Sequence, residues 1–263
     1  MRIISWNINS VRLRLDLLEQ LIEQTQPDVL CLQETKTTDD AFPRQAFHKF
    51  GYPHQLINGM KGYNGVAILS RLPLKGGRAQ NWCGRKDCRH LLATLPNGVE
   101  LHNVYVPSGG QFPVTTNEKF VHKLQFLDEM TAWWPKERTS ESPIILVGDL
   151  NIAPLENDVW SHKEMIDVIS HTSIEIEKLS AMQNTIGWVD VGRHFVPPEK
   201  KLYTWWSYRA HDWMTSNRGR RLDHIWVTSP LVSTLNQFST IQEARGWLPK
   251  PSDHIPVIVD IAL

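Results

Sequence analysis

Three acidic side chains, Glu34, Asp149 and Asp253, lie directly beside apolar runs rather than inside solvated charge clusters. Asn7 and Asn151 follow apolar runs in the same way. Such runs form buried strands, and in α/β proteins ligand sites form beyond the strand ends. Carboxylate and amide oxygens are ligands of hard cations, so the set favours Mg²⁺ or Mn²⁺ over Zn²⁺. Each acid alone is typical of a turn or a helix cap, and only the set indicates a site.

The segment Pro-Ser-Asp-His-Ile-Pro at 251–256 is the sharpest local signal. Its two prolines stiffen the chain around Asp253 and His254, directly before the last apolar run. We expect Asp253 to bind the cation and His254 to contact a phosphate or a nucleophile; the alternative is a polar turn. The sequence contains no serine nucleophile elbow and no P-loop, so acyl transfer and P-loop NTP hydrolysis have no residues to carry them.

Strand and helix signals alternate along the chain, which favours a layered α/β fold. Apolar runs predict strands at Ile3–Trp6, Val29–Leu32, Val66–Leu69, Leu101–Val106, Ile144–Val147, Ile225–Val227 and Val257–Ile261. Apolar residues at helical spacing predict helices over Val11–Gln24, stopped by Pro27, and over Asn117–Trp134, with a capping box at Thr115 and Glu118 and an end at Pro135.

Two of these strands break into similar turns. Ile3–Trp6 runs into Asn7-Ile8-Asn9, and Ile144–Val147 runs into Gly148-Asp149-Leu150-Asn151. If each strand opens one half of a sandwich, the two turns meet at a shared edge. The length of 263 residues fits one large domain or two small ones.

Composition excludes several classes of protein. No apolar run approaches the roughly 18 residues of a membrane span, and no secretory signal is visible. Three cysteines argue against a disulfide framework, so we expect a cytoplasmic protein with no membrane partner. Cys83, Cys88 and His90 resemble half a zinc site, but no second half has ligand spacing, and a loop with free thiols is favoured.

Charge and aromatic content leave nucleic acid open as a partner. Lys and Arg number 28 and so do Asp and Glu, so only a local basic patch could attract a polyanion. The run Arg218-Gly219-Arg220-Arg221 is one candidate. The eleven tryptophans suit both a large core and base stacking, and core packing accounts for most of them.

Seven short motifs occur in the order and spacing of exonuclease III, the apurinic/apyrimidinic (AP) endonuclease branch of the endonuclease/exonuclease/phosphatase superfamily. They are Trp6-Asn7-Ile8-Asn9, Leu32-Gln33-Glu34-Thr35-Lys36, Gly65-Val66-Ala67, Tyr105-Val106-Pro107, Gly148-Asp149-Leu150-Asn151, Arg221-Leu222-Asp223 and Ser252-Asp253-His254. The chain resembles this family over nearly its whole length. Asp-x-Asn and Ser-Asp-His are shared with deoxyribonuclease I, inositol-polyphosphate phosphatases and sphingomyelinases, whereas Leu-Gln-Glu-Thr-Lys and Tyr-Thr-Trp-Trp at 203–206 are closer to the AP-endonuclease branch.

The resemblance implies a fold and a metal site. The fold is a four-layer α/β sandwich, two packed mixed β-sheets flanked by helices, in a single domain over residues 1–263. Glu34 resembles the principal ligand of Mg²⁺, for which Mn²⁺ can substitute. The full set of implied metal-site residues is Asn7, Glu34, Asp149, Asn151, Asp253 and His254.

The resemblance also implies catalytic roles. Asp149 resembles the residue that orients or deprotonates the attacking water, and Asn151 would bind the scissile phosphate. His254 resembles the phosphate-contacting histidine, with Asp223 fixing its tautomer. Tyr105 resembles the tyrosine near the leaving group. These are the groups that phosphodiester hydrolysis needs: an aimed water, cation charge on the phosphate oxygens and help for the leaving alkoxide.

DNA contacts are implied at an aromatic pair and at several basic residues. In the family an aromatic packs against the extrahelical abasic sugar, and here Trp205 and Trp206 stand in that segment. Side chains alternate along a strand, so one ring faces DNA, and we expect Trp205; two core indoles are the alternative. Phosphate contacts are expected from Lys36, Arg89, Arg209, Arg218 and Arg221.

The implied function is a Mg²⁺-dependent DNA repair phosphodiesterase acting as a monomer. It would cut double-stranded DNA 5′ to abasic sites and act on blocked 3′ ends as 3′-5′ exonuclease and 3′-phosphatase. The loop Ser108-Gly109-Gly110-Gln111 departs from relatives that carry a longer amide or basic side chain, which leaves the balance of these activities open. The alternatives are a phosphatase or sphingomyelinase of the superfamily, and a DNA-binding module without activity.

Overall fold

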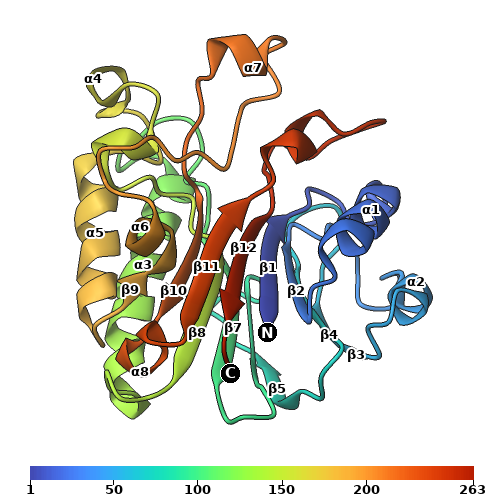
Figure 1. The fold of residues 1–263 in the computed structure, drawn as a ribbon. Helices are drawn as coiled ribbons and strands as arrows, with labels where there is room; N and C mark the ends of the chain where they lie inside the picture. Colours follow the sequence, from blue (N-terminus) through green and yellow to red (C-terminus); the bar gives the residue numbers. More distant parts are fainter.

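The computed structural model describes residues 1–263. Two six-stranded sheets pack face to face, and helices cover both outer faces (Figure 1). This arrangement confirms the four-layer α/β sandwich.

The first sheet has the strand order β11-β12-β1-β2-β4-β3. In that order its strands span Leu235–Thr240, Val257–Ile261, Arg2–Asn7, Val29–Gln33, Val66–Ser70 and His54–Asn58. The second sheet has the order β5-β6-β7-β8-β10-β9. Its strands span Lys75–Ala79, His90–Thr94, Glu100–Tyr105, Ile144–Asp149, Asp223–Val227 and Val189–Asp190.

Each sheet contains one parallel pair, β1 with β2 and β7 with β8. A parallel pair needs a crossover, and here the crossovers are the helices α1 (Leu15–Thr25) and α3 (Glu118–Glu137). The carboxyl ends of both strands in a pair therefore lie at the same edge of their sheet. The chain termini lie at the opposite end of the molecule from the loops around α4 (His162–Met165) and α7 (Trp213–Ser216) (Figure 1).

Two helices cover each sheet. Side chains of α1 and α2 (Arg44–Lys49) pack on the first sheet, and those of α3 and α5 (Ser173–Asn184) pack on the second. The other helical turns are short: η1 (Glu156–Asp158), α6 (Val191–Phe195), α8 (Ser229–Val232) and η2 (Gln242–Gly246). No helix has both the length and the apolar character needed to cross a bilayer.

The structure corrects three predicted helix boundaries. The first helix begins at Leu15 instead of Val11, and it ends where Gln26 adopts a left-handed conformation. The cap of α3 is Asn117, whose side chain accepts a hydrogen bond from the backbone N–H of Lys119, so the capping box at Thr115 is wrong. Pro135 lies inside the last turn of α3, because a proline there removes only one backbone hydrogen bond near a helix end.

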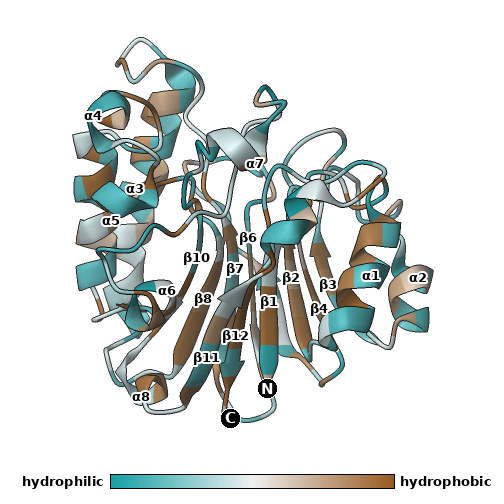
Figure 2. Cartoon of the chain, turned by 45° about the horizontal axis from the view of Figure 1, so that its top comes forward, coloured by the Kyte–Doolittle hydropathy of each residue, from teal (hydrophilic) through white to brown (hydrophobic).

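The core between the sheets follows from side-chain alternation along the strands. Alternate residues of each strand face the opposite sheet, for example Ile3, Cys31, Ile145 and Ile225. Their immediate neighbours along the same strand face the helices. Figure 2 shows the apolar middle of the strands and the polar outer surfaces of the helices. The sheets thus share one core, and side chains at the strand ends are held by it.

Five tryptophans form a continuous aromatic cluster between α3 and the second sheet. The ring centroids of Trp133 and Trp134 lie 4.8 Å apart, and those of Trp134 and Trp188 lie 4.9 Å apart. Trp82 joins the cluster through Trp133, and Trp226 joins it through Trp188. With the buried Trp6 and Trp206, seven of the eleven tryptophans pack the core, which agrees with the expectation from composition.

Candidate active site

The face between the two sheets turns from apolar to polar at one end of the strands. Asn7 is the last residue of β1, on the same face as Ile3, and Asp149 is the last residue of β8, on the same face as Ile145. Across the second sheet, Asp149 is paired with Tyr105 of β7 and Asp223 of β10. One row of neighbouring positions thus carries a phenol and two carboxylates.

Unusual backbone conformations set the direction of the turns that follow these strands. A Cβ atom at Gly148 would lie 1.9 Å from the carbonyl oxygen of Val104, so only glycine allows β7 and β8 to approach beside Asp149. Glu34 and Asn151 have φ values of 50° and 53°, in the left-handed region that side chains disfavour. Strain of this kind is typical of functional sites.

Hydrogen bonds draw the two sheets together around Asn7. Its amide nitrogen donates to Glu34 Oε1 and to Asp149 Oδ2, both at 2.9 Å. The hydroxyl of Tyr105 donates to Glu34 Oε1 at 2.9 Å. Asn151 holds Asp149 from the other side, with its backbone nitrogen 2.9 Å from Oδ1 and its amide nitrogen 3.1 Å from Oδ2. The two similar turns therefore meet at a shared edge, as predicted.

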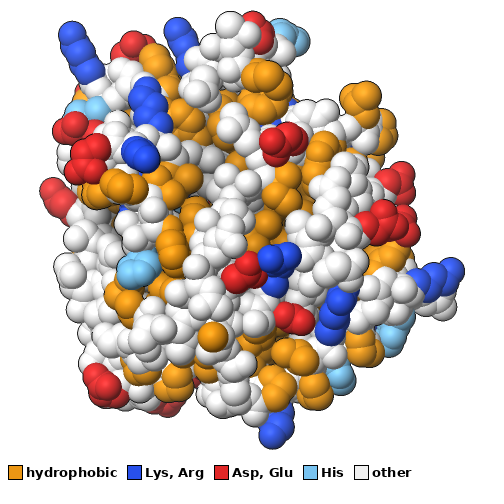
Figure 3. Space-filling model, viewed as in Figure 1, with side chains coloured by type: hydrophobic (Ala, Val, Ile, Leu, Met, Phe, Trp, Pro, Cys, Tyr) orange, Lys and Arg blue, Asp and Glu red, His pale blue; other side chains and the backbone are white.

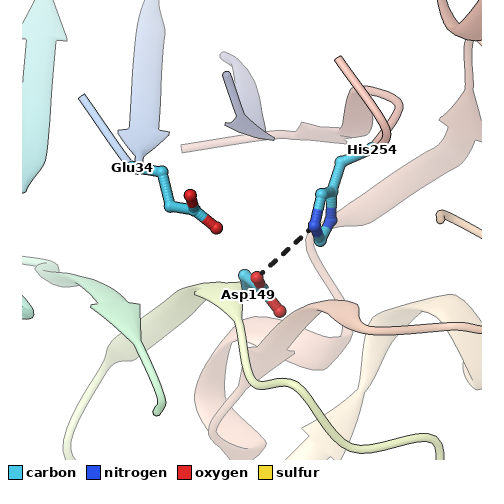
Figure 4. A group of neighbouring side chains, drawn as sticks. All are labelled: Glu34, Asp149 and His254. Atoms are coloured by element: carbon cyan, nitrogen blue, oxygen red, sulfur yellow. Dashed lines mark ion pairs between the residues drawn. The ribbon is translucent and has the colours of Figure 1, made fainter. Parts of the chain in front are cut away.

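His254 completes the group from the loop before β12. Its Nδ1 lies 2.9 Å from Asp223 Oδ2, which orients the ring. Its Nε2 lies 3.7 Å from Asp149 Oδ2, and Figure 4 shows His254 pointing toward Asp149, with Glu34 on the other side. Asp149, Asp223 and His254 are all buried.

Burial and neighbouring charges shift the pKa values of these groups. Burial raises the pKa of Asp149 to about 7 despite the nearby His254. Burial disfavours a charged His254, but Asp223 and Asp149 outweigh it and raise the pKa of the imidazole to about 10. Burial and the charge of Glu34 raise the pKa of Tyr105 well above its usual range. The site therefore holds a carboxyl that titrates near neutral pH beside a protonated histidine and a protonated phenol.

Glu34 stays ionised at neutral pH. Burial favours its neutral form, but Lys36 and Asn7 outweigh that effect and lower the pKa of the carboxyl. Lys36 Nζ lies 2.7 Å from Glu34 Oε2. A charged carboxylate is thus available as a cation ligand.

The donor set fits a hard divalent cation. The structure contains one group of three or more His, Cys, Asp and Glu residues whose ligand atoms lie within 4.8 Å of one another, and its members are Glu34, Asp149 and His254. Asp223 Oδ1 is buried without a hydrogen-bond donor, which adds to the negative charge beside them. Two carboxylates with at most one nitrogen suit Mg²⁺ or Mn²⁺ better than Zn²⁺.

Asp253 lies outside that group. Its Oδ1 accepts a hydrogen bond from the amide of Asn9 at 2.9 Å, and its Oδ2 accepts one from the indole of Trp205 at 3.0 Å. Its role as a ligand stays a prediction. Cys83 and Cys88 are free thiols.

Two cavities meet at the candidate site. One, of about 740 Å³, is lined by Glu34, Asn151 and His254 together with Trp205 and other residues. The other, of about 560 Å³, has several basic residues in its lining, among them Arg85, Lys86 and Arg89. The cavities share Tyr105 and Ser108. Trp205 is half-buried in the first cavity, whereas Trp206 is buried, as alternation predicts.

The five basic residues expected to contact DNA lie in different settings. Arg209 is exposed and lines the cavity of Trp205, and Arg89 lines the other cavity with its guanidinium over the ring of Tyr105. Lys36 is paired with Glu34. Arg218 is exposed, with its guanidinium 4.5 Å from the ring centroid of Trp160. On the face shown in Figure 3, basic and acidic side chains are interspersed and form no single basic patch.

The expectation that Arg221 contacts DNA is wrong. Its side chain is 1% exposed, and its guanidinium bonds to Asp158 through Nε and Nη2 and to Asp190 through Nη1. All three guanidinium nitrogens face carboxylates, and burial keeps the group away from a DNA phosphate. Its neighbour Arg220, which lines the cavity of Trp205, was not among the expected DNA contacts. Alternation could have found it, because adjacent residues of an extended segment face opposite ways.

The sequence has clear relatives. A profile of the endonuclease/exonuclease/phosphatase family matches residues 4–254. The exodeoxyribonuclease III of Haemophilus influenzae is 31% identical over 98% of this chain and 98% of its own length. The chain belongs to the exonuclease III/AP endonuclease family.

Solved structures agree with membership of the exonuclease III/AP endonuclease family. An AP endonuclease from Archaeoglobus fulgidus is 30% identical with a TM-score of 0.92, covering all of both chains. A 3′-phosphatase from Neisseria bound to a product DNA hairpin is 32% identical with a TM-score of 0.91, again covering all of both chains. The family therefore includes both kinds of enzyme on almost the same backbone.

Proposed function

We propose that this chain is a Mg²⁺-dependent DNA repair phosphodiesterase. It incises double-stranded DNA 5′ to abasic sites, leaving a 3′-hydroxyl, and it trims or dephosphorylates blocked 3′ ends. The observation that carries the proposal is the grouping of Glu34, Asp149 and His254 in one cluster, of which Glu34 and His254 line a cavity together with Trp205. Relatives that cleave DNA or remove 3′-phosphates support the substrate class.

The side chains divide the work of hydrolysis. Asp149 takes a proton from the attacking water, and its pKa of about 7 suits a group that must accept a proton near neutral pH. Asn7 and Asn151 hold its two oxygens in place. Asn151 also lines the cavity, where it is the residue we assign to the scissile phosphate.

Two further side chains, His254 and Tyr105, stabilise the charge on the phosphate and on the leaving oxygen. His254, kept protonated by Asp223 and Asp149, places a positive charge against a non-bridging phosphate oxygen. Tyr105 keeps its proton and donates a hydrogen bond near the leaving 3′-oxygen. Glu34, with Asn7 and Asp253 nearby, would hold a divalent cation, which would supply positive charge to the phosphate and the leaving alkoxide.

Selection of an abasic nucleotide falls to Trp205. Its ring lies in the same cavity as the catalytic side chains and is fixed by the bond from its indole nitrogen to Asp253. Extruding a nucleotide costs a few kcal/mol and least where the base is missing. A pocket closed by an indole favours a bare sugar over a normal nucleoside.

The remaining expectations belong to the same proposal. The two sheets share one core, which supports one domain over residues 1–263, and we expect this domain to work as a monomer. Three free cysteines fit a cytoplasmic setting.

Cleavage of a labelled duplex carrying one abasic analogue tests the proposal. With Mg²⁺ we expect incision 5′ to the lesion; with EDTA, or with Asp149→Asn, we expect none. Arg44→Met, an exposed change on α2, is the matched control and should cleave normally. DNA binding without incision would favour an inactive binding module. Hydrolysis of inositol phosphates or sphingomyelin without any cleavage of DNA would favour a phosphatase or sphingomyelinase.

A further inference from the structure

Three arginines close together in the sequence occupy three different environments. Arg221 is buried and fully paired with carboxylates. Arg218 is exposed and lies over Trp160. Arg220 lies between these extremes: it is half-buried, lines the cavity that contains the catalytic side chains, and makes no ion pair with any carboxylate. An unpaired cation in that position calls for an explanation.

Neutral contacts hold the guanidinium of Arg220 in place. Its Nη1 donates to the carbonyl oxygen of Ile169 and to Ser170 Oγ, both at 3.0 Å. Its carbon Cζ lies 5.1 Å from the ring centroid of Trp205. Its Nε is buried without an acceptor. The group is therefore oriented and partly desolvated, but its positive charge is not neutralised by a contact, and an arginine stays charged in such a setting.

The backbone relates Arg220 to the catalytic histidine. Trp205 forms isolated antiparallel bridges with Arg220 on one side and with His254 on the other. Residues that pair directly point to the same face, so the three side chains share one wall of the cavity. Neighbouring strands lie about 4.8 Å apart, which separates the backbones of Arg220 and His254 by about 10 Å. A substrate whose scissile phosphate lies at His254 thus reaches Arg220 with a group farther along the same strand.

We propose that Arg220 is a specificity-determining residue that binds an oxyanion beyond the scissile phosphate of the strand being cut. This inference rests on the proposed function of the site. Two sources have the required chemistry: the phosphate that follows the abasic nucleotide, and a carboxylate carried by a sugar fragment at a blocked 3′ end. A guanidinium recognises either through charge-assisted hydrogen bonds, which are stronger than neutral ones.

Two matched pairs of substrates distinguish the sources. In the first pair, a duplex with an abasic analogue carries either a phosphate or a neutral methylphosphonate at the next linkage. In the second pair, a 3′-terminal phosphodiester carries either a carboxymethyl or a neutral 2-hydroxyethyl group. For at least one pair, we expect kcat/KM of the wild-type enzyme to be about tenfold or more higher for the anionic member. The pair that shows the preference identifies the source.

Variants separate binding of the anion from a structural role. Arg220→Met should remove the preference by lowering kcat/KM for the anionic member alone, and Arg220→Lys should retain part of it. Ser170→Ala, which removes one contact of the guanidinium but keeps its charge, should preserve the preference, as should Arg44→Met. Circular dichroism checks that each variant is folded.

The outcomes are distinct. A wild-type enzyme that cleaves the members of both pairs equally would overturn the inference, whatever the variants do, and would leave the proposed function intact. An Arg220→Met enzyme that loses activity on anionic and neutral members by the same factor would also overturn it, because that pattern indicates a structural role. Absence of cleavage of every substrate by the wild-type enzyme would instead contradict the proposed function.

Discussion

Two clusters of buried charged residues lie next to each other in this fold, and they differ in charge balance. The catalytic cluster of Glu34, Asp149 and His254 has Lys36, Asp223 and Asp253 as charged neighbours. Together they place four carboxyl groups against the two cations His254 and Lys36. In the second cluster the charges are equal: Asp158 and Asp190 against Arg193 and Arg221. Residues of both clusters line cavities, and only the surplus of negative charge in the first fits a cation.

The pKa values express the same difference. In the second cluster, burial is outweighed by the arginines, and the pKa values of Asp158 and Asp190 are lowered. In the catalytic cluster, burial raises the pKa of Asp149 to about 7. Burial of charge therefore does not itself indicate function. A buried cluster with unbalanced charge, open to a cavity, does.

Asp149→Asn should give the largest effect. Loss of the group that accepts the proton should lower kcat by about a thousandfold or more, with duplex binding largely retained. Stability should not fall. The folded state raises the pKa of Asp149 to about 7. Ionisation of this carboxyl therefore favours the unfolded chain and lowers stability as the pH rises to about 7, and asparagine removes that cost. Urea unfolding at pH 8 in EDTA checks this, and a clear loss of stability would contradict the comparison.

Arg221→Met should have the opposite pattern. It leaves Asp158 and Asp190 buried with fewer cationic partners, which costs about 3–5 kcal/mol of unfolding free energy. Lys178→Met, which breaks the more exposed pair with Asp128, is the matched control and should cost less than about 1 kcal/mol. Activity per folded molecule should change little in both variants. Equal stability losses in the two would show that the second cluster is not structural.

Trp205→Ala should act on selectivity. The substitution opens the cavity while leaving the carboxylates and His254 in place, so incision at an abasic site should fall by about tenfold and trimming of an undamaged 3′ end should fall less. The ratio of the two rates on labelled duplexes measures the effect. Equal losses in both activities would show that Trp205 packs the structure and does not select the abasic nucleotide.

The buried pair of His90 and His102 predicts a smaller, pH-dependent effect on stability. His90 Nε2 lies 2.8 Å from His102 Nδ1, and burial lowers the pKa of both rings below 6.5. Because the unfolded chain binds protons more readily, stability is full above about pH 6.5 and falls as the pH drops below it. Urea midpoints at pH 7.5 and 5.5 measure the slope. His90→Asn should reduce it, and an unchanged slope would rule out His90 as its source.

Local signals in the sequence predict the layered α/β class and the polar residues of the cluster, whereas the four-layer sandwich follows from the family resemblance. Apolar runs mark seven of the twelve strands, and the polar residues beside the ends of these strands fall at the common edge. Asn7 and Asp149, which are 142 positions apart, are joined by a hydrogen bond for that reason.

What the sequence does not predict depends on contacts between distant segments. Arg221 is buried because it pairs with Asp158, which lies in η1, 63 positions away. No local pattern in Arg218–Arg221 indicates which of these guanidinium groups will pair with Asp158. The oxygens of Asp253 are likewise taken by Asn9 and Trp205. The helix ends depend on which of several capping residues the loop geometry selects, and Asn117 is used where Thr115 was equally suitable.

The cluster of tryptophans between α3 and the second sheet has an optical consequence. Indole rings held 4.8 and 4.9 Å apart couple their electronic transitions, so this region should dominate the near-ultraviolet circular dichroism of the protein. Trp205 stands outside that cluster. The near-ultraviolet signal should therefore report mainly the packing of the core, with a further contribution from Trp206 and Trp213, whose ring centroids lie 5.3 Å apart. A variant that keeps this signal has kept its fold, whatever happens to its activity.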